Sequence, residues 1–179
     1  MKIRKIQLPL KDTDIKKLKA GDMALLSGVV FTARDAAHKR IQLKIKNSKL
    51  KIRKLAINLK GQTVYYAGPA PAQPGKVIGS CGPTTSARMD AFTPALLGLG
   101  LKGMIGKGKR SEEVKKAIKK HKAVNFAAVG GTGALLAGRI KSAEVIAYKD
   151  LGTEAVRRLD LRDFPVVVAI DARGKSIYK

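Results

Sequence analysis

The sequence is poor in the residues that hold disulfides and metal ions. Its 179 residues include one cysteine, Cys81, and two histidines, His38 and His121. A single cysteine excludes an intramolecular disulfide and any metal centre built from several cysteines, and two histidines argue against a histidine-rich centre. We therefore expect no metal site in this chain and a reducing, cytoplasmic setting.

Long apolar runs and aromatic residues are also scarce. No stretch approaches the roughly 18 consecutive apolar residues of a membrane-spanning helix. Residues 1–11 are charged throughout and lack the apolar segment of a secretory signal, so we expect none there. Tryptophan is absent and only four Phe and four Tyr are present. Stacking platforms for single-stranded nucleic acid are therefore few.

Acidic residues are outnumbered: 37 Lys and Arg stand against 13 Asp and Glu, a net charge of +24. Residues 1–61 alone hold seventeen basic and four acidic side chains. Nucleic acid, an acidic protein subunit or an anionic substrate would each suit such a chain. No RNP, KH, zinc-finger or helix-turn-helix signature accompanies the charge, so a solvated surface or a protein partner is favoured over nucleic acid.

The length and the alternation of apolar segments with helix signals predict a single α/β domain. Strands are expected over residues 1–10, 23–32, 63–67, 76–79, 124–129, 144–149 and 165–170. Helices are expected over residues 33–41, 84–89, 93–99, 111–122, 134–140 and 153–159, with a helical turn or loop over 12–19. Residues 43–59 fit either spacing, and residues 68–75 and 100–108 are expected to be loops. Alternation in the last third predicts parallel strands there.

The first candidate anion site is the segment TARDAAH, residues 32–38, at the end of an apolar strand. Arg34 stands where that strand meets a helix N-terminus, and a guanidinium beside free backbone N–H groups suits a carboxylate or phosphate. The alternative is a surface arginine paired with Asp35. His38 is expected to pack or cap rather than to bind a metal.

The second candidate is GSCGPTTSARMD, residues 79–90. With a helix beginning at Thr84, Arg88 lies four residues further on and shares its face, which puts a hydroxyl beside a guanidinium, as a hydroxy-carboxylate requires. The alternative is a plain capping sequence with Arg88 in solvent. A helix start beside Cys81 would lower the pKa of its thiol, although no base accompanies it.

The third candidate is GMIGKG, residues 103–108, where flanking glycines let a backbone approach a ligand and Lys107 supplies a charge. The alternative is a flexible loop. Spacing excludes a P-loop and a nucleophile elbow. The dinucleotide pattern fails at Leu136, so Gly131 and Gly133 indicate a close strand–helix turn.

Taken together, TARDAAH, YYAGPAP, GSCGPTTSARMD and GMIGKG occur in an order that resembles the β subunit of class I fumarate hydratase. The L-tartrate dehydratase β subunit is its close relative. The resemblance covers residues 1–179 and implies one swivelling β/β/α domain of the fumarase β-subunit type.

This resemblance implies a hydro-lyase of the tricarboxylic acid cycle, which hydrates fumarate reversibly to (S)-malate. An α subunit would carry a [4Fe–4S] cluster on three cysteines, and this chain, inactive alone, would complete the active site. A hetero-oligomer such as two α and two β subunits is implied. Tartrate as substrate is one alternative, and a basic nucleic-acid-binding protein without catalysis is another.

Matched to the family's motifs, Thr84 is the implied catalytic acid or base. Arg34 and Arg88 would clamp substrate carboxylates, and Lys107 would add a charge to the same pocket. Thr85 and His38 would have supporting roles. The partner's open iron would act as a Lewis acid.

Overall fold

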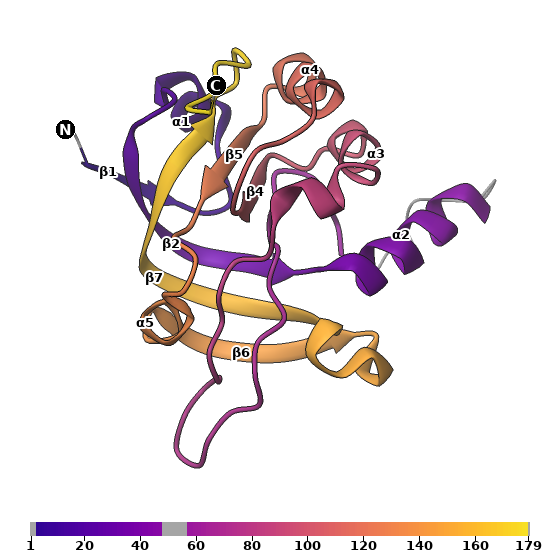
Figure 1. Ribbon diagram of the computed structural model, residues 1–179, viewed down its shortest axis with the longest axis vertical. Helices are drawn as coiled ribbons and strands as arrows, with labels where there is room; N and C mark the ends of the chain where they lie inside the picture. The colour runs from indigo at the N-terminus through magenta and orange to yellow at the C-terminus, as the bar shows by residue number, and fades with distance from the viewer. Residues whose placement is uncertain (1–2, 48–56, 179) are drawn as a thin grey trace.

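The computed structural model describes residues 3–47 and 57–178. Its strands are β1 (Ile3–Gln7), β2 (Met23–Thr32), β3 (Thr63–Tyr65), β4 (Gly103–Gly106), β5 (Val124–Ala127), β6 (Ile140–Ala147) and β7 (Val156–Ile170). Its helices are α1 (Asp12–Lys17), α2 (Asp35–Asn47), α3 (Thr93–Gly98), α4 (Glu112–His121) and α5 (Gly133–Ala137), with 3-10 helices η2 (Ser86–Met89) and η3 (Lys149–Glu154). Figure 1 shows their arrangement. In the part of the chain described, no helix is long and apolar enough to cross a membrane.

The sheet closes on itself because β2 pairs with β3 on one side and with β7 on the other. The strand order is β1-β2-β3-β4-β5-β7-β6, and the additional β2–β7 pairing joins the ends of the run from β2 to β7. Strands β2, β3, β4, β5 and β7 therefore form a barrel, and β1 and β6 are its edge extensions. The predicted α/β class is confirmed.

The first strands of the sheet pair in parallel, and the last strands pair antiparallel. Strands β1 to β5 pair in parallel with their neighbours. The long strand β7 is antiparallel to β2, β5 and β6. The prediction of parallel strands in the last third was therefore wrong. A short 3-10 connection takes β6 directly into β7, and such a connection favours an antiparallel pair.

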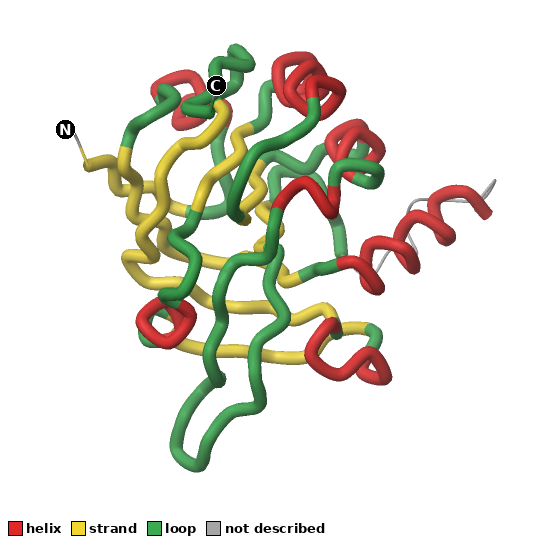
Figure 2. Tube along the Cα trace, in the orientation of Figure 1, coloured by secondary structure: helices red, strands yellow, loops and turns green. Residues whose placement is uncertain are grey.

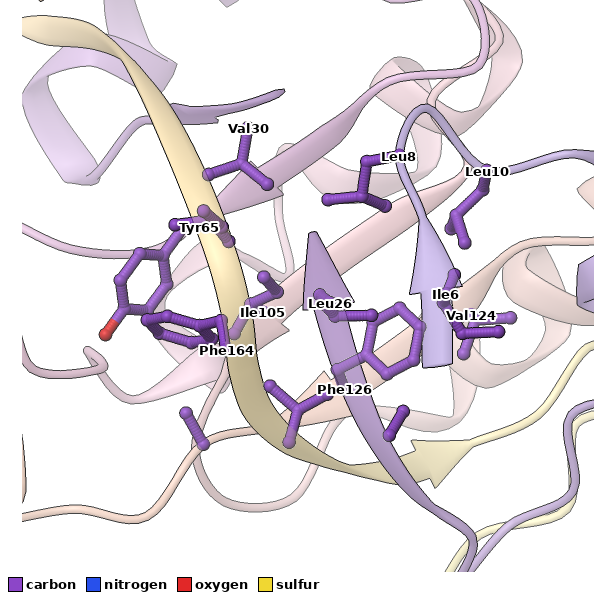
Figure 3. Close-up of a cluster of buried hydrophobic side chains, with 14 of the residues drawn as sticks. Ile6, Leu8, Leu10, Leu26, Val30, Tyr65, Ile105, Val124, Phe126 and Phe164 are labelled. Carbon is purple, nitrogen blue, oxygen red and sulfur yellow. The ribbon is translucent and has the colours of Figure 1, made fainter. Parts of the chain in front are cut away.

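Two apolar clusters stabilise the barrel. The first fills its interior, where side chains from β2, β4, β5 and β7, such as Leu26, Ile105, Phe126 and Phe164, point toward one another (Figure 3). The second lies outside, where Val64 and Met104 on the opposite face of the strands meet the apolar sides of α2, α3 and α4. Burial of alternate residues on both faces fixes which side of each strand faces the barrel.

Several local predictions were wrong. Residues 103–106, expected within a glycine-rich loop, form β4 between two parallel neighbours. Residues 153–159, expected as a helix, end the 3-10 helix η3 and begin β7. Residues 76–79 form no strand and belong to a long loop that extends from the sheet (Figure 2). Within the undecided segment 43–59, the chain is helical to Asn47, and residues 48–56 lie outside the described part.

Candidate functional site

The candidate residues gather where the parallel strands end. Arg34 follows β2, Gly68 follows β3, Lys107 follows β4 and Gly130 follows β5. The carboxyl ends of neighbouring parallel strands meet at one edge of a sheet, and ligands of α/β proteins bind at that edge. Candidate anion-binding segments that are separate in the sequence are therefore brought together at this edge of the sheet.

Backbone hydrogen bonds hold Thr84 at this edge. Its N–H donates to the carbonyl of Tyr66 at 2.6 Å, and its carbonyl accepts from the N–H of Lys107 at 3.1 Å. The N–H of Ser86 donates to the Lys107 carbonyl at 2.7 Å. Thr85 and Lys107 therefore form an isolated parallel β-bridge. The segment 84–86 thus extends the sheet.

This pairing corrects the expected helix over residues 84–89. The 3-10 helix η2 begins only at Ser86, and its preceding residue Thr85 is extended. Thr84 and Arg88 therefore do not share a helix face. Thr84 is half-buried, and its hydroxyl has no hydrogen-bond partner among the described residues.

Two glycines let side chains lie close to this edge. A Cβ at Gly106 would collide with the hydroxyl of buried Ser86 and lie 3.2 Å from the Thr84 carbonyl, so only glycine lets the segment 84–86 approach β4. A Cβ at Gly130 would lie 3.5 Å from Nζ of Lys107. The exposed side chain of Lys107 therefore lies along the turn that follows β5.

Arg34 is enclosed by acidic groups and by Gly68. Its Nε lies 3.8 Å from Asp35 Oδ2, and its Nη2 lies 3.6 Å from Glu154 Oε1. A Cβ at Gly68 would lie 2.8 Å from Nη1 of Arg34, so a larger residue there would displace the guanidinium. Nε is buried without a hydrogen-bond partner. The alternative pairing of Arg34 with Asp35 is thus observed, but as a long contact.

Arg88 reaches the same carboxylate from η2. Its Nε donates to Asp35 Oδ1 at 3.1 Å, and its Nη2 donates to Asp35 Oδ2 at 2.7 Å. The Arg88 side chain is 49% exposed. Two guanidiniums from segments far apart in the sequence therefore meet at Asp35, on the face that also carries Thr84.

His38 packs beneath this face, as the sequence predicts. Its ring lies between Tyr66 and Phe92, with centroids 5.5 Å from each. Its Nδ1–H donates to the carbonyl of Arg34 at 2.8 Å. Burial lowers the pKa of His38 to about 4, although the bond to the Arg34 carbonyl opposes this effect. His38 is therefore neutral near pH 7, with its proton on Nδ1.

We expect His38 to make stability depend on pH. Its pKa is about 4 in the folded chain and about 6.5 in the unfolded chain, so the unfolded chain binds more protons between these values. Stability should fall as pH drops from 6.5 to 4, by up to about 3 kcal/mol. Urea unfolding of wild type and of His38→Gln measures this. His121→Gln should lose stability with falling pH as wild type does. An equal pH dependence of the free energy of unfolding in wild type and His38→Gln would contradict the assignment.

Arg110 forms a buried polar network that sequence reasoning missed. Its side chain is 0% exposed, and its Nε donates to Asp90 Oδ1 at 2.6 Å. Nη1 donates to Asn125 Oδ1 at 2.8 Å, and Nη2 donates to Thr93 Oγ1 at 2.6 Å. The other Asp90 oxygen accepts from the N–H of Ser111, the predicted and confirmed N-cap of α4. The network ties η2, which carries Arg88, to α3, α4 and β5.

Cys81 is unsuited to chemistry. The residue is fully buried, and burial raises the pKa of its thiol to about 12. The expectation of a lowered pKa was wrong because no α-helix begins beside it. Its carbonyl instead accepts a hydrogen bond of 2.6 Å from the hydroxyl of Tyr65, which fastens the segment before Thr84 to β3.

Cavities of 340, 580 and 340 Å³ lie away from these residues. The largest lies between the loop 70–80 and α5, a second lies between α5 and β7, and the third lies beside α1. At the candidate site, Thr85, Arg88 and Lys107 are exposed. Arg34 and Thr84 are half-buried beside them.

Comparisons with known proteins agree on one family. The model for "Fumarase C-terminus" matches residues 1–179. A putative L(+)-tartrate dehydratase subunit beta of Methanocaldococcus jannaschii is 38% identical over 176 residues, which cover 95% of this chain and 88% of that protein. The aerobic class I fumarate hydratase of Escherichia coli K12 is 36% identical over 156 residues, 86% of this chain but 28% of that protein. Fumarate hydratase 2 of Leishmania major is 36% identical over 160 residues, 88% of this chain and 28% of that protein. The chain thus matches only about a quarter of the length of these fumarate hydratases.

Proposed function

Because the chain belongs to the fumarase C-terminus family, we propose that it is the β subunit of a hydro-lyase that hydrates fumarate reversibly to (S)-malate. The observation that carries this proposal is the sheet edge where the segment of Thr84 pairs with Lys107 and where Arg34 and Arg88 meet at Asp35. A free hydroxyl among guanidinium and ammonium groups suits proton transfer on a dicarboxylate.

A second subunit should cover this edge. The M. jannaschii relative is named as subunit beta, and the chain matches 28% of the E. coli fumarate hydratase. Both facts support a partner α subunit. We propose that it carries the rest of the active site, in a hetero-oligomer such as two α and two β chains. On this proposal, residues 1–179 form one swivelling β/β/α domain, inactive without its partner.

The basic side chains would bind and orient the substrate. Fumarate and malate are dianions, and Arg34 and Arg88 present planar N–H donors that match carboxylates. Lys107 adds a compact charge at the end of β4. With the carboxylates held by these cations, the substrate carbon that exchanges a proton would face the Thr84 hydroxyl.

Thr84 would move the proton. In dehydration its oxygen takes the proton from carbon while the hydroxyl group leaves the neighbouring carbon. In hydration it returns that proton as water adds. A threonine hydroxyl is a weak base, and nearby cations stabilise its ionised form. His38 would support this site by fixing the carbonyl of Arg34, and Thr85 by its bridge to Lys107.

The described part of this chain offers no ligand set for an iron–sulfur cluster. Groups of three or more His, Cys, Asp or Glu that could hold a metal ion are not found there, and Cys81 is buried with a raised thiol pKa. We propose that the α subunit holds the [4Fe–4S] cluster, as the resemblance to class I fumarate hydratase implies. When bound there, its open iron would supply a Lewis acid for the departing hydroxyl.

Tartrate is the second candidate substrate, because the M. jannaschii relative, of whose length this chain matches 88%, is named for it. Tartrate is also a dianion and would use the same cations. Dehydration of tartrate gives oxaloacetate, so the two reactions are separable by product.

Anaerobic capture of the tagged chain with its partner tests the proposal. The complex should be brown, should contain a cysteine-bearing second chain and should consume fumarate or tartrate, whereas the isolated chain should consume neither. Tartrate turnover alone would move the assignment to the dehydratase. An inactive complex rich in nucleic acid would refute both.

A further inference from the structure

A carboxylate of this chain, Asp35, lies between the two arginines assigned to the substrate. Its Oδ2 is 2.7 Å from Nη2 of Arg88 and 3.8 Å from Nε of Arg34. Its Oδ1 accepts a second hydrogen bond from Arg88. One carboxylate oxygen therefore faces both guanidiniums, one from the neighbouring residue and one from a residue 53 positions further along the chain.

A second carboxylate closes the other side of Arg34. Glu154 Oε1 lies 3.6 Å from the Arg34 guanidinium, while its Oε2 accepts from the N–H of Ala36 at 2.8 Å. Glu154 is thereby fixed to the first turn of α2. Because the buried Nε of Arg34 has no hydrogen-bond partner, its orientation depends on these charges and on the contact with Gly68.

We propose that Asp35 is a positioning residue that holds Arg34 and Arg88 at the spacing a dicarboxylate requires. This inference rests on the proposed function. Two guanidiniums on one face repel each other, and a carboxylate between them offsets that repulsion. The bidentate pair also fixes the plane of Arg88, which is otherwise half exposed and free to turn into solvent. Further N–H groups of Arg88 remain for the substrate.

The substitution Asp35→Asn tests this in the captured complex. It keeps the size of the side chain and removes the charge that both arginines share. We expect the KM for the dicarboxylate to rise about tenfold or more, with a smaller change in kcat, because the arginines bind substrate and transition state alike. Asp35→Glu keeps the charge and should recover part of the loss.

A matched control is available in η3, which pairs with the same helix α2. Asp150 accepts two hydrogen bonds from Arg40 of α2, the same kind of bidentate pair, away from the site. Asp150→Asn should leave the KM unchanged. Thermal unfolding and capture of the α subunit should be similar for Asp35→Asn and wild type, which separates positioning from folding.

Succinate, a dicarboxylate without the reacting double bond, provides a readout apart from turnover. Its Kd for the complex, measured by calorimetry, should rise by a factor similar to that of the KM. An active wild type with a KM and Kd unchanged or lowered in Asp35→Asn would overturn the inference and leave the proposed function standing. A wild-type complex that turns over neither dicarboxylate would overturn both.

Discussion

Thr84→Val should reduce turnover of the assembled complex by about 10²- to 10⁴-fold, the contribution of a general acid–base group. Valine keeps the shape of the side chain and removes the hydroxyl. The backbone bonds of Thr84 to Tyr66 and Lys107 remain, so the segment should keep its place. The loss should appear in kcat, with little change in substrate binding, because the hydroxyl acts on the transferred proton. Steady-state kinetics on the captured complex measures both.

Thr84→Ser is the matching control. It restores a hydroxyl at the same position and should recover most of the turnover, within about tenfold of wild type. Both variants should capture the α subunit as wild type does. Full turnover in Thr84→Val would show that another group moves the proton and that Thr84 belongs only to the sheet extension.

Local sequence signals predicted the elements that local physics controls. The apolar, β-branched run 23–32 gives β2 with the same bounds. Ser111 caps α4 because its hydroxyl accepts from the N–H of Val114 three residues later. The predicted position of Arg34 between a strand and a helix is confirmed, because β2 ends at Thr32 and α2 begins at Asp35.

Features that depend on distant residues were not predictable. The glycines of residues 103–106 indicate a loop by composition, yet they let Thr63 and Ser86 pack against β4. The spacing of residues 153–159 fits a helix, but a strand on each side of β7 decides the outcome. The contact of Asp35 with Arg88 joins two elements that no spacing rule relates, and the same is true of Arg110 and Asn125.

Arg110→Met should lower the free energy of unfolding by about 3–5 kcal/mol. Methionine fills similar volume but leaves Asp90 without its buried partner, and it removes the donors to Thr93 and Asn125. Burial disfavours the charged form of Arg110, yet Tyr66 and Asp90 raise its pKa, so the guanidinium stays charged. Urea unfolding of the chain measures the change. The network must be satisfied as a whole, because each group left unpaired in the interior costs free energy.

Arg40→Met is the matched control for Arg110→Met, because Arg40 also pairs bidentately with an aspartate, Asp150. Its side chain is 40% exposed and that of Asp150 is 62% exposed, so the change should lower the free energy of unfolding much less than Arg110→Met does. Asp90→Asn combined with Arg110→Met should cost less than the separate losses together, because the two residues share one interaction. Equal losses for the buried and the exposed arginine would mean that Arg110 does not hold η2, and hence Arg88, against the barrel.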